Sequence, residues 1–355
     1  MDNQQVLFKL AILQQITTMK CPFDIQTNRE CILGIPSFYS PKYYKQMKFS
    51  ISIILFFFGI MASAQENTFK SEDLSITPLL DGTLLLPKAS ETIPLAIIIG
   101  GSGPIDRNGN QQMMVNNSLK FLAEGLYDYG IATFRYDKRI VKQMKLRNVN
   151  EKNIRFSDFI DDAAAILAYF KADKRFSKIY IIGHSQGSLV GMVAAQNGAD
   201  GFVSIAGAGQ EIDDVVVEQL KKQAPGLADN ARTSFDDLRA NGVAYNYSPG
   251  LASIFRKEIQ PFIFTWMQYD PKVEIAKLQM PVLIINGDND IQVQVSEAEL
   301  LKNAKPGAEY MIIPKMNHIF KEIEGNDLEN SKSYNIHNLP VIPELIEAIS
   351  DFIKN

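Results

Sequence analysis

Short apolar runs alternate with segments of helical period along most of the chain. Gly130 closes the helical segment around Leu122, and further helices are predicted around Ile166 and over residues 341–353. The apolar runs that predict strands are bounded by turn residues and lie at 80–86, 94–99, 131–136, 178–182, 201–205, 281–285 and 310–313. This alternation predicts a mostly parallel sheet with helices on both faces.

One region interrupts the alternation. Residues 211–275 contain no good strand but three helical stretches, the last of which is broken at Pro261. We therefore expect an α/β core formed by residues 65–210 and 276–355, with residues 211–275 as a helical cap over the strand ends. A long surface excursion is the alternative, but the aromatic side chains of this region indicate that it packs against something.

The N-terminal region carries the parts of a secretory signal. A basic start at Lys48 precedes an apolar stretch of about 11 residues, and an A-x-A cleavage site follows at 62–64. We interpret residues 47–64 as a signal peptide, so that the mature protein is exported to the periplasm or secreted. An anchor helix is the alternative, but the stretch is short for a membrane span of about 20 residues. Residues 1–46 precede the signal's own methionine and are interpreted as a mis-annotated upstream extension.

Composition narrows the class of protein. The apolar share of 46% and the charged share of 21% are those of a soluble globular chain, and the net charge of -4 gives no electrostatic reason to expect nucleic acid as a partner. Both cysteines, Cys21 and Cys31, lie in the upstream extension. A mature chain beginning at Gln65 would have no disulfide, cysteine nucleophile or cysteine zinc site. We expect no metal and no organic cofactor.

A nucleophile motif follows the strand predicted at 178–182. Gly183-His184-Ser185-Gln186-Gly187 fits G-x-S-x-G between a strand and a helix. The glycines allow a sharp turn that would expose the serine hydroxyl at the carboxyl edge of the sheet. The helix that follows would favour negative charge developing at its N-terminus. Without partners for the serine, the motif could equally be a tight turn.

The rest of the chain supplies those partners. His318 directly follows the last predicted strand, whereas His337 lies in a polar loop and His184 is interpreted as a packing residue that points away from the serine. Gly287-Asp288-Asn289-Asp290 follows the strand predicted at 281–285. The order Ser185, Asp290, His318 is the Ser…Asp…His order of one hydrolase class. The sequence therefore predicts a catalytic triad of these three residues.

Donors for an oxyanion are also present. Residues 100–103 form a glycine-rich loop after an early strand, where backbone N–H groups can approach a substrate oxygen. The N–H groups of Ser102 and Gln186 are the predicted pair. A phosphate-binding loop is the alternative, but the P-loop lysine is missing.

Together these features resemble the α/β-hydrolase family across residues 80–355. Residues 101–110, GSGPIDRNGN, look like the GSGPxDRxGN segment of a bacterial carboxylesterase branch, and Tyr269-Asp270-Pro271 is similar to that branch too. The chain departs from the family at Asp137-Lys138-Arg139-Ile140, where a glycine often stands at the last position, which puts the shape of that loop in doubt. The side chains at 106–108 could contact substrate or form a self-bonded turn.

The resemblance implies hydrolysis of small-molecule carboxylic esters, with small acyl groups. In the family pattern the acid stands three residues after the glycine, which selects Asp290. A turn position also suits Asp288 to binding backbone N–H groups. The same triad would serve an exported peptidase, an amidase or a thioesterase. A non-enzymatic binding protein of this fold would be expected to have a broken triad, and all three positions are intact here.

Overall fold

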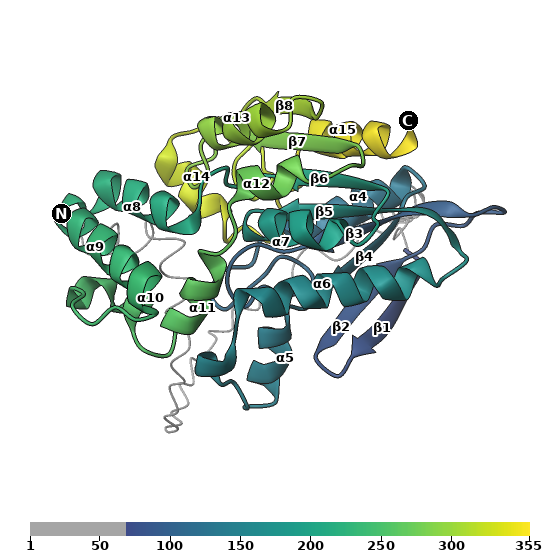
Figure 1. Ribbon diagram of the computed structural model, residues 1–355. Coiled ribbons are helices and arrows are strands. Elements are labelled where there is room, and N and C mark those ends of the chain that lie inside the picture. Colours follow the sequence, from purple (N-terminus) through teal and green to yellow (C-terminus); the bar gives the residue numbers. More distant parts are fainter. Residues whose placement is uncertain (1–68) are drawn as a thin grey trace, which may run out of the picture. The chain divides into compact units, whose positions relative to one another are not determined.

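The computed structural model describes residues 69–355, so the predicted extension (1–46) and signal peptide (47–64) lie outside the described residues. Eight strands form one sheet in the order β1-β2-β4-β3-β5-β6-β7-β8 (Figure 1). β2 is antiparallel to both of its neighbours, and all later pairs are parallel. The strands are β1 (Ser71–Thr77), β2 (Leu80–Leu85), β3 (Ile93–Ile99), β4 (Ala132–Tyr136), β5 (Phe176–His184), β6 (Gly201–Ile205), β7 (Val282–Gly287) and β8 (Glu309–Ile313).

The α/β fold class predicted from the sequence is confirmed. Each predicted strand is present. The central strands are buried on both faces of the sheet, which is why they appear in the sequence as continuous apolar runs. β1 was not predicted. Its residues alternate between more and less exposed positions at the sheet edge, and Leu74 and Ile76 are its only large apolar side chains. That signal is too weak to distinguish an edge strand from a loop.

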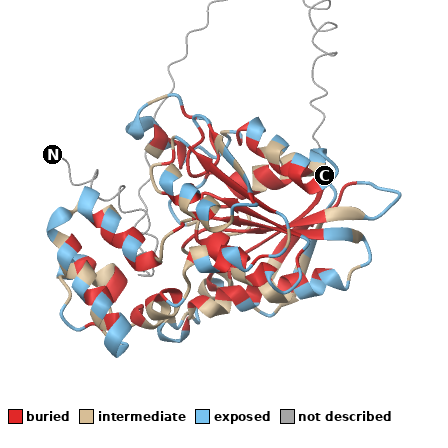
Figure 2. Cartoon of the chain, turned by 45° about the horizontal axis from the view of Figure 1, so that its top comes forward, coloured by how far each residue is buried: buried red, intermediate tan, exposed pale blue. Residues whose placement is uncertain are grey.

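Helices cover both faces of the sheet. α4 and α15 pack on one face, and α6, α7 and α13 pack on the other; the buried side of each helix is shown in red in Figure 2. Gly130 ends the turn after α4 with a φ of 78°, as predicted. The helices are α4 (Ser118–Asp128), α5 (Arg139–Lys145), α6 (Phe156–Lys171), α7 (Gln186–Ala195), α8 (Ile212–Gln223), α9 (Pro225–Asn241), α10 (Ala252–Phe255), α11 (Gln260–Trp266), α12 (Pro271–Ala276), α13 (Val295–Ala304), α14 (Asp327–Ser333) and α15 (Pro343–Lys354), with 3-10 turns at Glu151–Asn153 and Pro249–Leu251.

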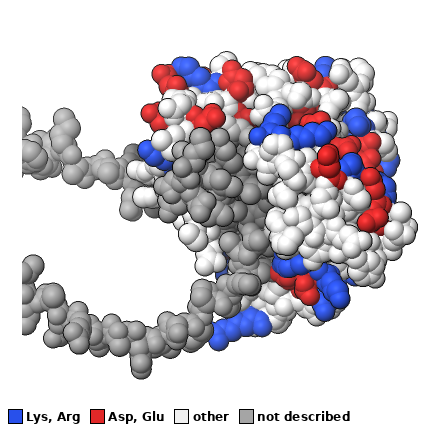
Figure 3. All heavy atoms as spheres, turned by 90° about the vertical axis from the view of Figure 1, so that its left-hand side faces the viewer, with Lys and Arg blue, Asp and Glu red and all other residues white. Residues whose placement is uncertain are grey.

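Helices α8 to α11, which come between β6 and β7 in the sequence, form a separate layer at the left of Figure 1. The indole of Trp266 stacks on the ring of Phe156 in α6, with centroids 5.2 Å apart and an interplanar angle of 6°. Arg232 and Arg239 both contact the buried carboxylate of Asp213. On the face shown in Figure 3, basic and acidic side chains lie next to one another. Aromatic packing thus joins this layer to the core, and ion pairs hold its own helices together.

No helix within residues 69–355 has both the length and the apolar character needed to cross a membrane.

Candidate active site

Ser185 lies on a strained turn between β5 and α7. Its φ is 55° and its ψ is −123°, a backbone conformation that is rare for a residue with a side chain. A Cβ added to Gly187 would lie 2.5 Å from the carbonyl oxygen of Ile99, and one added to Gly183 would overlap the carbonyl oxygen of Gly187. The glycines on either side of the serine are therefore required by close backbone contacts.

His318 and Asp290 are bonded to each other at the same edge of the sheet. Nδ1 of His318 lies 2.7 Å from Oδ2 of Asp290, and both side chains are buried. The other oxygen of Asp290 accepts hydrogen bonds from the backbone N–H groups of Gln292 (2.7 Å) and Val293 (2.9 Å). Since a carboxylate only accepts, Nδ1 of His318 donates and Nε2 is left as the basic nitrogen.

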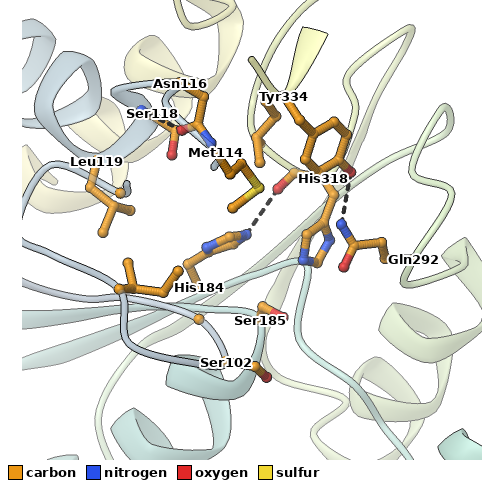
Figure 4. A pocket seen from close by; sticks show the side chains of 14 residues that line it. Ser102, Met114, Asn116, Ser118, Leu119, His184, Ser185, Gln292, His318 and Tyr334 are labelled. Atoms are coloured by element: carbon orange, nitrogen blue, oxygen red, sulfur yellow. Dashed lines mark hydrogen bonds between the residues drawn. The ribbon is translucent and has the colours of Figure 1, made fainter. Parts of the chain in front are cut away.

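Ser185 and His318 line one pocket. Figure 4 shows the serine side chain below the imidazole of His318. The structure thus brings together the three residues of the predicted triad at the ends of β5, β7 and β8. The neighbouring Asp288 is exposed, and its Oδ1 accepts a hydrogen bond of 2.6 Å from the backbone N–H of Lys315.

His184 differs from its prediction. It was expected to point away from the site, but its ring lines the pocket beside Ser185 (Figure 4). Nε2 of His184 lies 2.9 Å from the carbonyl oxygen of His318, and the two rings have centroids 4.8 Å apart. Burial and the neighbouring His318 hold the pKa of His184 well below its ordinary value, so the ring is neutral and donates to that carbonyl. His184 therefore supports the backbone of His318. The side chain of His337 is exposed, in line with its expected loop position.

The two predicted oxyanion donors lie close to the serine, because Gln186 follows it in the chain and a Cβ added to Gly101, the neighbour of Ser102, would lie 3.2 Å from the Cβ of Ser185. Ser102 follows β3 in the glycine-rich loop and lines the pocket, and Gln186 is the first residue of α7. Within residues 69–355, neither backbone N–H is paired with an acceptor. An N–H at the first position of a helix has no partner inside the helix and can bind an anion.

The loop that carries Ser102 is anchored by charged side chains. Nε and Nη2 of Arg107 each lie 3.1 Å from a carboxylate oxygen of Asp137, at the end of β4. Oδ1 of Asp106 accepts hydrogen bonds from the backbone N–H groups of Asn108 (2.8 Å) and Asn110 (2.9 Å). Of the two roles left open for residues 106–108, the structure shows the self-bonded turn.

Other residues of the pocket wall were not predicted. They come from the segment after the glycine-rich loop, the Asp290 loop, the His318 loop and the turn after α14, and comprise Ile105, Gly109, Met114, Asn116, Ser118, Leu119, Gln292, Ile319 and Tyr334. Helices α8 to α11 contribute no residue to this described lining. Phe262 and Trp266 of that layer pack on Phe156 and Phe159 of α6, so the aromatic side chains of this region do pack against the core, as expected from the sequence. No signal in the sequence marks the residues that do line the pocket.

Among residues 69–355, no group of three or more His, Cys, Asp or Glu side chains is placed to hold a metal ion.

Comparison with known proteins gives relatives in sequence and in fold. The chain is 28% identical over 275 residues to Esterase EstD of Thermotoga maritima. The match covers 73% of this chain and 62% of EstD, so the chain spans less than two thirds of its relative. No protein-family model matches the chain.

Solved structures that share the fold include the following two. Est1E of Butyrivibrio proteoclasticus superposes with a TM-score of 0.50 at 17% identity, covering 80% of this chain and 99% of Est1E. The α/β hydrolase GrgF of Penicillium sp. sh18 also gives a TM-score of 0.50, at 14% identity, covering 80% of this chain and 98% of GrgF. With the observed strand order, these similarities show that the chain has the α/β-hydrolase fold.

Proposed function

We propose that this protein is a serine hydrolase that cleaves carboxylic esters, with Ser185 as nucleophile, His318 as base and Asp290 as the acid that orients the histidine. The observation that carries the proposal is the 2.7 Å contact between Nδ1 of His318 and Asp290, in a pocket that also exposes Ser185 on a strained turn. EstD is named an esterase, and its sequence similarity to this chain supports the same reaction class.

The geometry supports a two-step acyl transfer. Nε2 of His318 takes the proton of Ser185 as Oγ attacks the ester carbonyl, and Asp290 stabilises the imidazolium that forms. The N–H groups of Ser102 and Gln186 take the oxyanion. His318 then gives its proton to the leaving alcohol, and water, activated by the same histidine, releases the acid from the acyl-enzyme. Each step uses side chains or backbone groups of this chain.

We further propose a preference for small acyl groups. The pocket wall beside Ser185 includes Leu119, Met114 and Tyr334. The hydroxyl of Tyr334 is held by the side-chain amide of Gln292 at 2.9 Å, which fixes this part of the wall. A panel of nitrophenyl esters of increasing acyl length tests the preference for small acyl groups. Aminoacyl anilides assayed beside it test whether esters are preferred to amides. Faster turnover of chains longer than about ten carbons, or of the anilides, would contradict this proposal.

The test of the nucleophile is Ser185→Ala. Loss of the acyl-enzyme route should lower kcat for nitrophenyl acetate by about 10⁴-fold or more, while circular dichroism stays that of the wild type. Ser188→Ala is a matched control three residues further on, in α7, because its hydroxyl bonds that of Ser204 and lies outside the triad. An active Ser185→Ala enzyme would exclude this mechanism.

We also propose that the chain is exported and that its mature form begins at Gln65. Cleavage after Ala64 would leave the whole sheet intact, because β1 begins only at Ser71. The intact mass of the protein recovered from the periplasm or medium checks the site. A recovered product that retains residues 47–64 would show that the segment is an anchor or part of the mature chain.

A further inference from the structure

One buried lysine contacts both segments that supply the predicted oxyanion donors. Lys138 lies between β4 and α5, and only 4% of its surface is exposed. Its Nζ is 2.8 Å from the carbonyl oxygen of Gly101 and 2.8 Å from Oε1 of Gln186. The same nitrogen lies 4.4 Å from the ring centroid of Phe159 in α6. The amine thus donates two hydrogen bonds, and it also makes a cation–π contact with the ring face of Phe159.

The two acceptors belong to the residues that supply the oxyanion donors. The carbonyl of Gly101 and the N–H of Ser102 are the two ends of one planar peptide group. A hydrogen bond to that carbonyl fixes the plane of the peptide and strengthens its N–H as a donor, because hydrogen bonds in a chain polarise one another. The second bond fixes the side chain of Gln186, whose own backbone N–H is the other donor.

The position is costly for a lysine. Burial lowers the pKa of Lys138 to about 7, and the carboxylate of Asp162, which works in the opposite direction, is itself bonded to Arg139 at 2.7 Å. An apolar side chain of similar length would avoid this desolvation. The fold therefore retains a buried amine where its chief contacts are with the Ser185 site.

We propose that Lys138 is a positioning residue of the oxyanion hole, which aligns and polarises the peptide N–H of Ser102 and holds Gln186 in place for catalysis. The proposal rests on the proposed esterase function. It predicts that Lys138 stabilises the tetrahedral transition state and contributes little to binding of the ester ground state.

Lys138→Met tests this with the full chain, with nitrophenyl acetate as substrate and phenylboronic acid as the probe. Ser185 adds to the boron of this probe, so its tetrahedral adduct places an oxygen in the oxyanion hole. We expect kcat to fall by about 10- to 100-fold, less than the loss of a direct donor, with KM within about threefold of the wild type. The inhibition constant of the boronic acid should rise by the same factor as kcat falls.

Lys321→Met is the matched control. Lys321 is also buried, its Nζ donates to the carbonyl of Leu339 at 2.6 Å, and it lies 4.8 Å from the ring centroid of Phe121. The Lys321→Met variant should be less stable than the wild type, with unchanged kcat and boronate affinity. Lys138→Arg, which keeps the charge and donors, should recover part of the lost rate.

The outcomes separate the two proposals. Suppose that the wild type cleaves esters and needs Ser185. The role of Lys138 alone would then be overturned if Lys138→Met kept kcat within twofold, or if it lost rate without losing boronate affinity. A wild-type protein that cleaves no ester would overturn the proposed function and this inference with it. If Lys138→Met does not fold, Lys138→Gln is the second variant, since its side chain is one atom shorter than that of lysine and its uncharged amide cannot polarise the Gly101 carbonyl as the ammonium does. Normal kcat and boronate affinity in that variant would contradict the proposal.

Discussion

The carboxyl edge of the sheet and the layer formed by α8 to α11 are held together differently. At the edge, short hydrogen bonds between functional groups dominate, such as the one from His318 to Asp290. The helical layer is joined to the core by packing, with Trp266 stacked on Phe156 and the hydroxyl of Thr265 accepting a bond of 2.9 Å from the backbone N–H of Phe156. Polar contacts at the edge fix orientation, whereas the layer contributes mostly buried apolar surface.

Because of this difference, we expect the residues that set the reaction rate to be distinct from those that set the free energy of unfolding. A substitution at the edge should change the rate of the chemical step far more than the free energy of unfolding. A substitution where the layer meets α6 should do the reverse, because none of the described pocket lining comes from α8 to α11. Paired substitutions in the two regions test this contrast.

The largest effect is expected at Asp290. Asp290→Asn should lower kcat by about 10⁴-fold, because asparagine stabilises the wrong tautomer of His318. Asp288→Asn keeps an oxygen that can accept from the N–H of Lys315 and removes only the charge, so it should cost at most about 1 kcal/mol of stability with kcat nearly unchanged. Steady-state kinetics and urea unfolding of both variants check this. A dead Asp288→Asn enzyme beside a functional Asp290→Asn enzyme would show that the wrong acid was assigned.

Trp266→Ala should give the opposite pattern. The indole is 6% exposed and fills the interface between α11 and α6, so its removal should cost about 3–5 kcal/mol. We expect kcat of the folded variant to stay within about threefold of the wild type. Denaturant unfolding followed by kinetics at low temperature would reveal both values. A loss of kcat comparable to that of Asp290→Asn would show that the layer takes part in the chemistry.

A smaller, pH-dependent effect is expected from Lys138. Its pKa is lowered to about 7 in the folded protein and returns to about 10.5 on unfolding, so the unfolded chain binds more protons between these values. Stability conferred by this residue should therefore rise with pH across that window, by at most about 1.4 kcal/mol per pH unit. The unfolding free energy of the wild type minus that of Lys138→Met should therefore increase as the pH is raised from 7 to 10. A constant difference would indicate that the lysine is not desolvated.

Residues that form contiguous motifs could be predicted from the sequence. Ser185 lies between glycines after an apolar run, and Asp290 and His318 each follow a predicted strand. Because parallel strands place their carboxyl ends at one sheet edge, strand order alone predicts that these residues meet. The edge strand β1 lacked such a signal, since its two large apolar residues are separated by exposed positions.

Contacts between distant segments could not be predicted. Lys138 was noticed only as part of a loop with a missing glycine, yet its partners Gly101 and Gln186 lie 37 and 48 residues away along the chain. The orientation of His184 depends on the carbonyl of His318, 134 residues further on. Periodicity describes which face of an element is buried, and it carries no information on which loop side chains converge at the end of a strand.

Trapping the acyl-enzyme would show directly whether Ser185 is the nucleophile. Rapid mixing with nitrophenyl acetate should release a burst of about one nitrophenolate per protein molecule when deacylation is slower than acylation. Mass spectrometry of the acid-quenched protein should then place a single acetyl group on the peptide containing Ser185. A burst that persists in Ser185→Ala, or an acetyl group found on another residue in the wild type, would contradict the assignment of Ser185 as the nucleophile.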